Sequence, residues 1–364
     1  MSIANDALPQ RANVGLLHGG SSSKTGILLV NTGTPDSPAV GDVRRYLRQF
    51  LSDPRVLDMP PLARWLLLEL VILPFRPAKS AEAYRKIWSE AGSPLRLHGL
   101  SLAEKLQEQL TGCEVRLAFQ FGNPAIPDQI DALRALGCDR LVVVPLFPHY
   151  AAASFGSTAA AVMAQAATRW VVPSVQIIEP FWDAPEFQLA VTEAVREHML
   201  QFEPDHVLLA YHGVPERHCT KTDASGSHCL KSAGCCDGIV AANRHCYRAQ
   251  CYATSRALID SLGLDPARTT TAFQSRLGRI PWIRPYADEV IDQLGKAGVQ
   301  KLLVVEPSFV ADCLETLEEI GIRGAHDFQT AGGGELQLVP SLNTRDVWVR
   351  GLAAIVKRNS AWAN

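Results

Sequence analysis

Short apolar runs alternate along this chain with longer amphipathic stretches. The runs that we expect to be strands occupy residues 27–31, 115–120, 140–144, 175–178, 206–210, 269–274, 301–305 and 336–339. Helical patterns lie around them, at residues 40–51, 81–88, 101–109, 126–136, 157–168, 187–200, 247–262, 286–297, 313–321 and 345–356. Strands that alternate with helices are typical of parallel sheets covered on both faces, so the pattern predicts an α/β fold.

The second half of the chain repeats the first. The matching segments are GILLVNTGTP (26–35) with HVLLAYHGVP (206–215), LAFQF (117–121) with TAFQS (271–275), and DRLVVVPLF (139–147) with QKLLVVEPSF (300–309). Buried strands often resemble one another, but three matches in the same order favour a true repeat. We therefore predict two similar Rossmann-like, doubly wound domains with parallel four-stranded sheets, at residues 25–190 and 191–345, and a C-terminal helix and tail at 346–364.

His212 is the first candidate for chemistry. Sheets of this class bind ligands beyond the carboxyl ends of their strands, and His212 follows the strand at 206–210, where the repeat aligns it with Thr32. Gly213 and Pro215 favour a sharp turn that directs the preceding side chain into the cleft between the domains. An imidazole can accept a proton or bind a metal near neutral pH. A histidine satisfied within its own loop is the competing interpretation.

Two carboxylates follow the strand at 301–305. Glu315 and Glu319 are four residues apart and share one face of the predicted helix. Near a histidine, such a pair suits a cation or a proton relay. The sequence also allows a purely structural alternative, because Asp312 and Glu315 match the Asp-x-x-Glu pattern of a helix capping box.

Aromatic residues lie near several of the same strand ends. Tyr150, Phe273 and Trp282 could form the wall of a pocket for a large, flat, apolar ligand. Ordinary core packing is the alternative for each ring.

Composition narrows the choice of partners and compartment. The 364 residues have a net charge of −2, which gives no support to a nucleic-acid partner. The most apolar stretch, Trp65–Phe75, contains Glu69 and Pro74 and is too short to span a membrane. It predicts either a core helix or an apolar surface lip that touches a membrane. The segment Met1–Lys24 lacks the apolar centre of a signal peptide and ends in a Gly/Ser-rich run typical of a flexible tail, so we expect a cytoplasmic protein.

The chain has nine cysteines, and six of them fall within 33 residues. In a reducing compartment such a group indicates metal binding before disulfides. These six residues are Cys219, Cys229, Cys235, Cys236, Cys246 and Cys251.

Several long motifs together resemble ferrochelatase. They are LLVNTGTP, VRRYLRQFLSDPRV, YRKIWSEAGSPL, PLFPHYAAASFGST, YHGVPERH, FQSRLGRIPWIRPY and DCLETLEEI, in that order from about Thr25 to Val356. The resemblance implies an enzyme that inserts Fe²⁺ into protoporphyrin IX and releases two protons, the last step of haem synthesis. It also implies two Rossmann-like domains, in agreement with the repeat.

The resemblance assigns roles to individual residues. His212 corresponds to the active-site histidine and Glu315 to its acidic partner, and together they handle the ferrous substrate and the pyrrole protons, with the division between them left open. Thr32, Tyr150, Phe273 and Trp282 are then expected at the substrate, with Glu319 continuing an acidic path. The chain departs from the family at Cys313, where animal members have histidine, and at Gln120-Phe121, where many members have Arg-Tyr.

Some ferrochelatases carry a [2Fe–2S] cluster. The resemblance therefore implies such a cluster in the cysteine-rich segment. The expected ligands are Cys229, Cys236, Cys246 and Cys251, with Cys235 and Cys219 as alternates. A Zn²⁺ site and free thiols are the competing interpretations. A coproporphyrin or other tetrapyrrole chelatase and a non-catalytic haem or metal sensor also remain open, as does the choice between a monomer and a homodimer.

Overall fold

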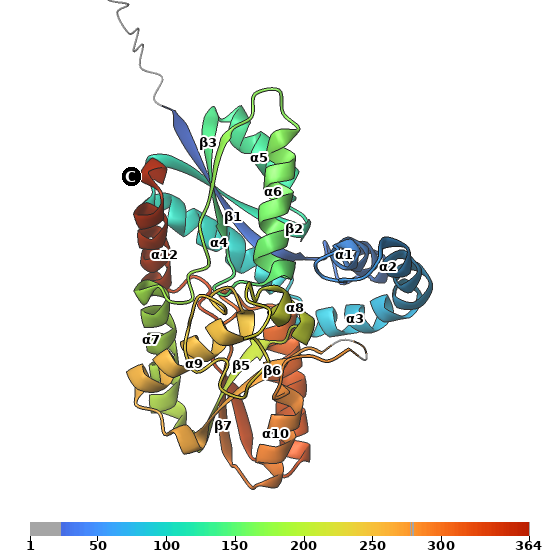
Figure 1. Cartoon of the computed structure of the whole chain (residues 1–364), viewed down its shortest axis with the longest axis vertical. Helices are drawn as coiled ribbons and strands as arrows, with labels where there is room; N and C mark the ends of the chain where they lie inside the picture. The colour runs from blue at the N-terminus through green and yellow to red at the C-terminus, as the bar shows by residue number, and fades with distance from the viewer. Residues whose placement is uncertain (1–22, 277, 279, 364) are drawn as a thin grey trace, which may run out of the picture.

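Two parallel sheets form the centre of the molecule (Figure 1). The structure is a computed structural model, and it describes residues 23–276, 278 and 280–363. The expectations for the N-terminal tail before residue 23 lie outside this range. The sheets have the strand orders β2-β1-β3-β4 and β6-β5-β7-β8. Their strands are β1 (Lys24–Thr34), β2 (Cys113–Gly122), β3 (Cys138–Pro145), β4 (Ser174–Ile177), β5 (His206–His212), β6 (Thr269–Gln274), β7 (Lys301–Val305) and β8 (Glu335–Leu338). The identical orders confirm the predicted α/β class with two similar sheets.

The repeat extends to the register of the strands. Leu29 lies opposite Leu117 on one side and Val144 on the other. Its counterpart in the second sheet, Leu209, lies opposite Thr271 and Val305, the residues that the sequence alignment pairs with Leu117 and Val144. The carboxyl ends of the two central strands therefore present equivalent positions, Thr32 and His212.

Helices cover both sheets. They are α1 (Val40–Ser52), α2 (Pro61–Leu67), α3 (Leu73–Ile87), α4 (Pro94–Gln109), α5 (Ile126–Ala135), α6 (Ser157–Ala167), α7 (Pro185–Phe202), α8 (Glu216–Lys221), α9 (Tyr247–Leu262), α10 (Ala287–Lys296), α11 (Ala325–Thr330) and α12 (Asp346–Asn359), with π-helical segments η1 (Leu68–Ile72), η2 (Ala152–Gly156) and η4 (Glu315–Gly324). The helix predicted at 81–88 begins earlier, at Leu73, because Pro74 is compatible with a first helical turn. Helix α8 was not predicted, and only the end of α2 lies in the apolar stretch for which a helix was one alternative.

The two halves exchange their last helices. Helix α7 packs against α9 and β7 of the second half, whereas α12 packs against α4 and α7, so the two helices form one continuous layer beside both sheets (Figure 1). Trp348 of α12 is fully buried against Phe181 and Phe187. The proposed boundary at residue 190 therefore falls inside a continuous helix that joins the halves.

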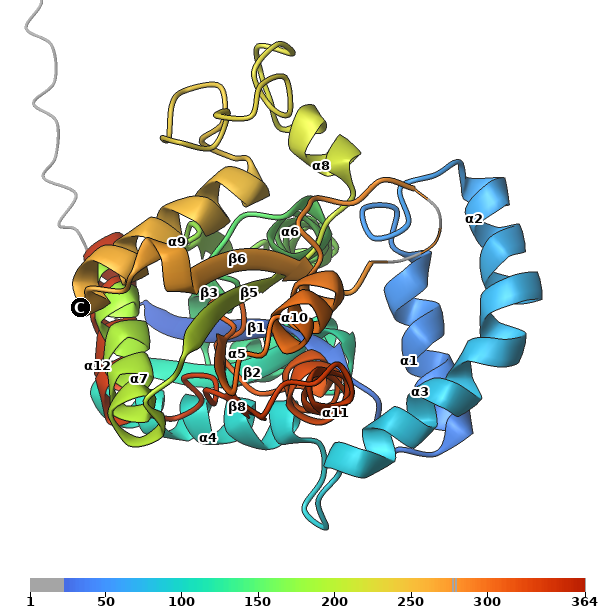
Figure 2. The same ribbon diagram turned by 90° about the horizontal axis from the view of Figure 1, so that it is seen from below.

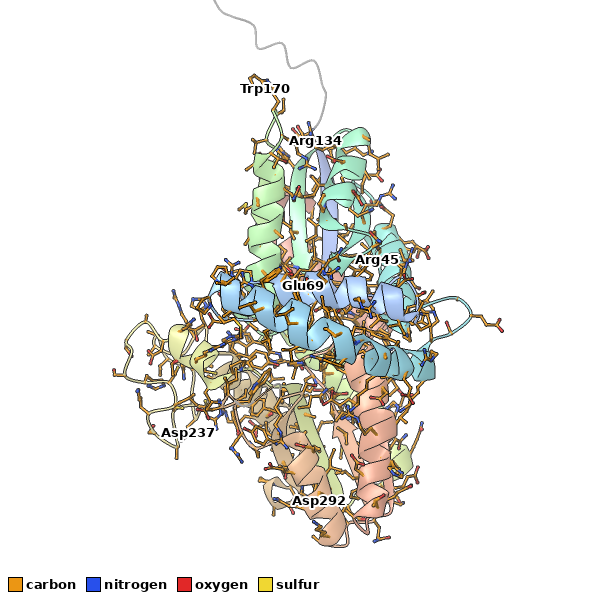
Figure 3. All side chains as sticks on the ribbon, turned by 90° about the vertical axis from the view of Figure 1, so that its right-hand side faces the viewer. Arg45, Glu69, Arg134, Trp170, Asp237 and Asp292 are labelled. Atoms are coloured by element: carbon orange, nitrogen blue, oxygen red, sulfur yellow. The ribbon has the colours of Figure 1, made fainter. Side chains whose placement is uncertain are left out.

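The apolar segment Trp65–Phe75 lies on the surface. It forms the end of α2, η1 and the start of α3, in the group of helices that projects from the body of the molecule (Figures 1 and 3). Trp65 is 56 % exposed and Phe75 is 75 % exposed, so the core-helix alternative was wrong. The other exposed apolar side chains of this surface, which we call the lip, are Leu62, Leu66, Leu70 and Val71. Within the described residues no helix is long and apolar enough to cross a membrane.

Candidate active site

His212 is the last residue of β5, and its side chain is half-buried. Its backbone N–H lies 3.3 Å from the Ser308 hydroxyl oxygen, and its Nδ1 lies 2.6 Å from the Gly213 carbonyl oxygen. Because a carbonyl oxygen only accepts, Nδ1 carries the proton and Nε2 of the neutral ring keeps its lone pair. The ring lies between Trp282 and Phe309, at centroid distances of 6.4 and 6.3 Å. The local fold thus presents a histidine nitrogen that can accept a proton or bind a metal.

Glu315 begins the π-helix η4, and it does not form the capping box that the sequence allowed. The backbone N–H of Asp312 donates to the side-chain oxygen of Asn343 (2.9 Å), and the Asp312 carboxylate accepts from Ser341 and Asn343 at 3.0 and 2.7 Å. The backbone N–H and the carboxylate of Asp312, which a capping box would use, are therefore both bonded to the 341–343 loop. The half-buried Glu315 carboxylate is therefore not part of a capping box, and it interacts with the Cys313 thiol.

Gln274 joins the two candidate residues. It ends β6 and pairs in register with His212 on the neighbouring strand. Its side-chain amide donates to the backbone carbonyl of Glu315 at 3.2 Å. Sequence reasoning missed Gln274, although the aligned Gln120 at the end of β2 was a signal that the repeat preserves a glutamine at this position.

Helices of the first half close the site around Glu315. The hydroxyls of Tyr46 in α1 and Tyr84 in α3 bond to each other, and the negative charge of Glu315 acts on both. Tyr46 also donates to the Gly33 carbonyl at 3.1 Å. Burial above all, and then neighbouring charge, raises the pKa of both tyrosines, so they remain neutral hydroxyls. No pattern in the sequence indicated this pair, because helices α4 to α7 and strands β2 to β4 separate it from the second half.

Glu306 is the most deeply buried acid next to the site. It follows β7 directly, its carboxylate oxygens lack a close hydrogen-bond partner among the described residues, and the Gln274 side chain nearby partly stabilises its charged form. Burial raises the pKa of Glu306 well above its usual value, and the negative charges of Glu319, Asp312 and Glu315 raise it further. The fold therefore favours the protonated form of Glu306 relative to an exposed glutamate. A charged residue directly after an apolar strand was the overlooked signal.

Acidic side chains continue outward along η4. Glu319 accepts a 2.7 Å hydrogen bond from Ser275. Glu318 pairs with Lys86 of α3 at 3.0 Å, and Arg323 lies 3.6 Å from both Glu318 and Glu319. The negative charges of Glu318 and Glu319 are thus balanced by Lys86 and Arg323.

The aromatic residues predicted to form one wall differ in their exposure. Tyr150 is half-buried between Phe155 and His245, with ring centroids 5.6 Å away on each side. Phe273 is only 1 % exposed and packs against Tyr211 and Tyr252, so its place is in the core and not on an accessible wall. Its side chain alternates to the buried face of β6, which a reading of strand ends alone does not show.

Thr32, the counterpart of His212, is half-buried at the end of β1. Its backbone N–H donates to the Asn31 side chain at 2.8 Å. The position therefore lies within the last residues of strand β1, where the second half carries the imidazole.

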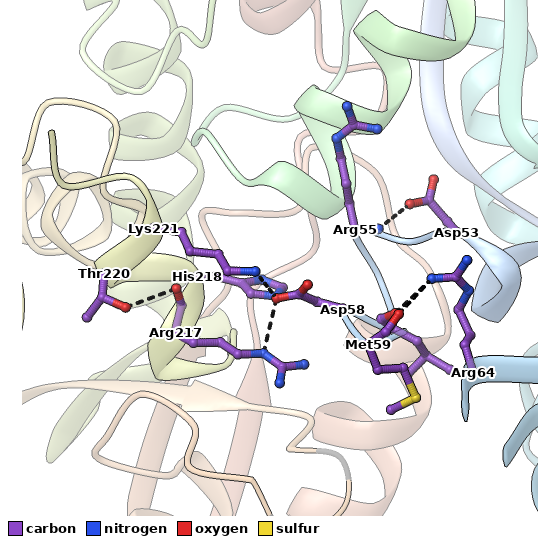
Figure 4. A network of polar contacts seen from close by, with 10 residues as sticks. Asp53, Arg55, Asp58, Met59, Arg64, Arg217, His218, Thr220 and Lys221 are labelled. Atoms are coloured by element: carbon purple, nitrogen blue, oxygen red, sulfur yellow. Dashed lines mark hydrogen bonds and ion pairs between the residues drawn. The ribbon is translucent and has the colours of Figure 1, made fainter. Parts of the chain in front are cut away.

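A charged network connects the lip to the turn that follows His212 (Figure 4). Asp58, in the loop between α1 and α2, lies 2.5 Å from Lys221 and 3.2 Å from Arg217, both on α8. The hydrogen bond from Lys221 above all lowers the pKa of Asp58, helped by the charge of Arg217. Because α8 begins four residues after His212, this network ties the base of the lip to the candidate active site.

The six clustered cysteines are all buried. Five of them form two groups, a trio (Cys219, Cys229 and Cys246) and a pair (Cys235 and Cys236), and Cys251 lies apart from both. The thiols of Cys219 and Cys229 both interact with Cys246, whereas the sulfurs of Cys235 and Cys236 are 3.7 Å apart. The pKa of Cys246 is lowered to about 6, first by the Cys219 thiol and also by backbone N–H groups at the start of α9. Cys251 instead contacts the hydroxyl of Tyr247.

The thiols of this segment are of the chemical type that a thiolate-bound centre requires. Arg248 reaches the Cys236 sulfur at 3.2 Å. In the described part of the chain, however, no three His, Cys, Asp or Glu side chains are arranged around a common point as ligands of one ion. Cys219, an alternate in the sequence-based ligand set, thus contacts Cys246, whereas Cys251, a member of that set, contacts Tyr247.

Comparison with known proteins decides the family. The family model named Ferrochelatase matches residues 24–360. The chain belongs to the ferrochelatase family. It is similar to the ferrochelatase of Coxiella burnetii (strain CbuK_Q154), with 43 % identity over 341 residues that cover 93 % of this chain and 95 % of the relative. The ferrochelatase of Pseudomonas entomophila (strain L48) is 44 % identical over 330 residues, which cover 90 % of this chain and 97 % of the relative.

Membership of the ferrochelatase family makes this protein a metal chelatase that inserts ferrous iron into a porphyrin for haem synthesis. Among solved structures, SirB from Bacillus subtilis with Fe3+ has a TM-score of 0.52 at 14 % identity and covers 93 % of this chain and 96 % of its own. That likeness is one of fold, and it agrees with the two repeated sheets.

Proposed function

We propose that the porphyrin substrate is protoporphyrin IX and that His212 and Glu315 carry the metal insertion. One observation supports this assignment above others: Gln274 pairs with His212 in the sheet and its side chain binds the backbone of Glu315, so the residues that carry a proton-accepting nitrogen and a carboxylate are joined through one residue. The reaction exchanges two N–H protons of the porphyrin for one Fe²⁺, so the site needs both a base and an anionic ligand.

In this proposal Nε2 of His212 accepts the pyrrole protons. Its hydrogen bond to the Gly213 carbonyl fixes the tautomer in which Nε2 is free. The Glu315 carboxylate binds the incoming Fe²⁺, a cation for which carboxylate oxygens are suitable ligands. Glu319 continues the acidic row toward solvent, while Trp282, Tyr150 and Thr32 are the residues that we assign to contact with the macrocycle.

The proposal is tested by an anaerobic assay with Fe²⁺ and either protoporphyrin IX or coproporphyrin. We expect metalloporphyrin absorbance to appear faster with protoporphyrin. A preference for coproporphyrin would move the assignment to that tetrapyrrole, and absence of insertion with either porphyrin would leave only the metal or haem sensor.

We also propose that the exposed lip contacts a membrane surface from the cytoplasmic side. Six apolar side chains are exposed there without a covering element among the described residues, a pattern typical of peripheral attachment. Porphyrins are apolar, so a lip in the membrane interface would receive the substrate from the lipid phase.

The cysteine-rich segment is proposed to bind a [2Fe–2S] centre in preference to Zn²⁺. The trio Cys219, Cys229 and Cys246 together with Cys236 supplies four thiols, and the low pKa of Cys246 favours the thiolate that either centre requires. This choice replaces Cys251 of the sequence-based set by Cys219. We assign the centre a structural role, since the segment lies beyond α8 and not in the cleft.

A further inference from the structure

The backbone around His212 is held from both sides of its strand. On the β6 side, the N–H of Gly213 donates to the Gln274 carbonyl at 2.7 Å. On the β7 side, the pairing of β5 with β7 ends at Leu209, and the N–H of His212 donates instead to the Ser308 hydroxyl oxygen at 3.3 Å. A side chain therefore takes the place of a strand partner at the residue that we assign as the base.

Ser308 is in turn bonded to Tyr247, the first residue of α9. Burial above all raises the pKa of the Tyr247 hydroxyl, and its two hydrogen bonds act in opposite directions: the bond with Ser308 lowers this pKa, and the bond with Cys251 raises it. A donor stabilises the charged phenolate, whereas an acceptor stabilises the neutral hydroxyl. Ser308 therefore donates to Tyr247, and Tyr247 donates to Cys251.

These contacts form one chain of hydrogen bonds, from the His212 backbone N–H through the hydroxyls of Ser308 and Tyr247 to the Cys251 sulfur. Each hydroxyl accepts one bond and donates the next, an arrangement in which neighbouring bonds polarise one another. The far end is fixed, because Tyr247 is only 8 % exposed and Cys251 is fully buried. Both belong to helix α9, which lies along β6 in Figure 2. The position of His212 thus depends on α9 as well as on the sheet.

Tyr211, the residue before His212, has similar surroundings but a different partner. It is fully buried, and its hydroxyl lies 2.9 Å from the hydroxyl of Ser255 on α9. The imidazole of His149 lies edge-on to both tyrosine rings, with centroid distances of 5.5 Å to Tyr211 and 5.9 Å to Tyr247. Of these two tyrosines, Tyr247 is the one bonded to Ser308.

We propose that Ser308 and Tyr247 are positioning residues for iron insertion, which hold the backbone of His212 so that its Nε2 reaches the pyrrole protons. The inference rests on the proposed function, because it takes His212 as the base. Ser308 also precedes Phe309, whose ring lies 6.3 Å from the His212 ring, so movement of Ser308 would shift that contact as well. A small displacement of a reacting nitrogen slows the reaction far more than it weakens substrate binding.

Steady-state iron insertion by the full chain, with Fe²⁺ and protoporphyrin IX, tests the proposal. We expect Tyr247→Phe and Ser308→Ala each to lower kcat about tenfold and to leave KM within about twofold, because the placement of the reacting nitrogen changes and the porphyrin contacts do not. Tyr211→Phe is the matched control, since it removes a buried tyrosine hydroxyl next to His212, and its kcat should stay within about twofold of wild type. Denaturant titrations should give similar losses of stability for both tyrosine variants, as each loses a buried hydroxyl.

The double variant Tyr247→Phe, Ser308→Ala shows whether one residue acts through the other. Its kcat should equal that of Ser308→Ala, whereas losses that multiply would show independent effects and overturn the chain. A loss of kcat in Tyr211→Phe equal to that in Tyr247→Phe would also overturn it.

The positioning chain and the proposed function fail in different ways. Loss of turnover in His212→Ala, together with wild-type kcat in Tyr247→Phe and Ser308→Ala, would overturn the positioning chain alone. Wild-type turnover in His212→Ala would instead overturn the proposed function.

Discussion

The side chain of Gln274 donates a 3.2 Å hydrogen bond to the backbone carbonyl of Glu315, and the backbone of Gln274 lies in register with His212. This relationship makes the position of the π-helix η4 depend on the end of β6. Since Gln274 is buried, its amide has no water to replace a lost partner.

The first prediction concerns this tether. Gln274→Leu should lower kcat for iron insertion about tenfold with little change in the Kd for porphyrin, because Glu315 loses its fixed position relative to His212. The matched control is Gln120→Leu, at the equivalent place in the first sheet, where the side chain accepts from Thr158. Equal losses of kcat in the two variants would show that Gln274 acts only through general stability.

His212 itself is the subject of the second prediction. His212→Ala should reduce iron insertion at least about 100-fold, the range expected for loss of a positioned base, while porphyrin fluorescence titration gives a nearly unchanged Kd. Thr32→Ala changes the equivalent position of the first half, and there we expect an effect on KM alone. Turnover near the wild-type rate in His212→Ala would remove the histidine from the mechanism.

The buried acid Glu306 should make stability depend on pH. Its folded-state pKa is raised, so between the unfolded value of about 4.3 and the folded value the native state binds the extra proton. Stability is therefore greatest below the unfolded pKa and falls as pH rises, with a slope of up to about 1.4 kcal/mol per pH unit. Glu306→Gln should remove this slope in denaturant titrations from pH 4 to 8.

The exposed Glu335→Gln is the control for Glu306→Gln, and it should keep the wild-type slope. If Glu306→Gln keeps that slope as well, then the Glu306 carboxyl is ionised in the folded protein.

The fourth prediction tests the thiolate-bound centre. Protein purified without oxygen should contain iron and acid-labile sulfide and absorb in the visible range, and Cys246→Ser should lose both because Cys246 joins the thiols of Cys219 and Cys229. Cys138→Ser, a buried cysteine on β3, should retain them. Zinc without sulfide would favour the competing metal, and neither metal in any variant would leave free thiols.

The lip gives a fifth prediction. The double variant Trp65→Ser, Phe75→Ser should bind lipid vesicles about tenfold more weakly than wild type in sedimentation assays, because two large exposed apolar side chains are removed. Trp170→Ser is the control, since Trp170 is fully exposed but lies at the end of the first half, away from the lip (Figure 3). If Trp170→Ser has the larger effect, then the membrane contact is at that end of the molecule.

The sequence by itself determined the two sheets, their equivalent strands and the position of His212. Apolar runs such as Leu302–Val305 are buried on both faces, and that pattern is a local property of the chain. The alignment of Thr32 with His212 followed from the same pattern and needed no tertiary information. The resemblance paired His212 with Glu315, which the sequence pattern had already made a candidate.

Tertiary structure decided which side chains meet. The capping box at Asp312 was plausible locally, yet Asn343, thirty-one residues away in the chain, occupies its donor and acceptor. Phe273 and Trp282 looked alike as aromatic residues near one strand end, but the pleat buries Phe273 whereas Trp282 lies beside His212. The contacts of Gln274 with Glu315 and of Tyr150 with His245 join segments separated by loops of variable length, so no periodic pattern could predict them.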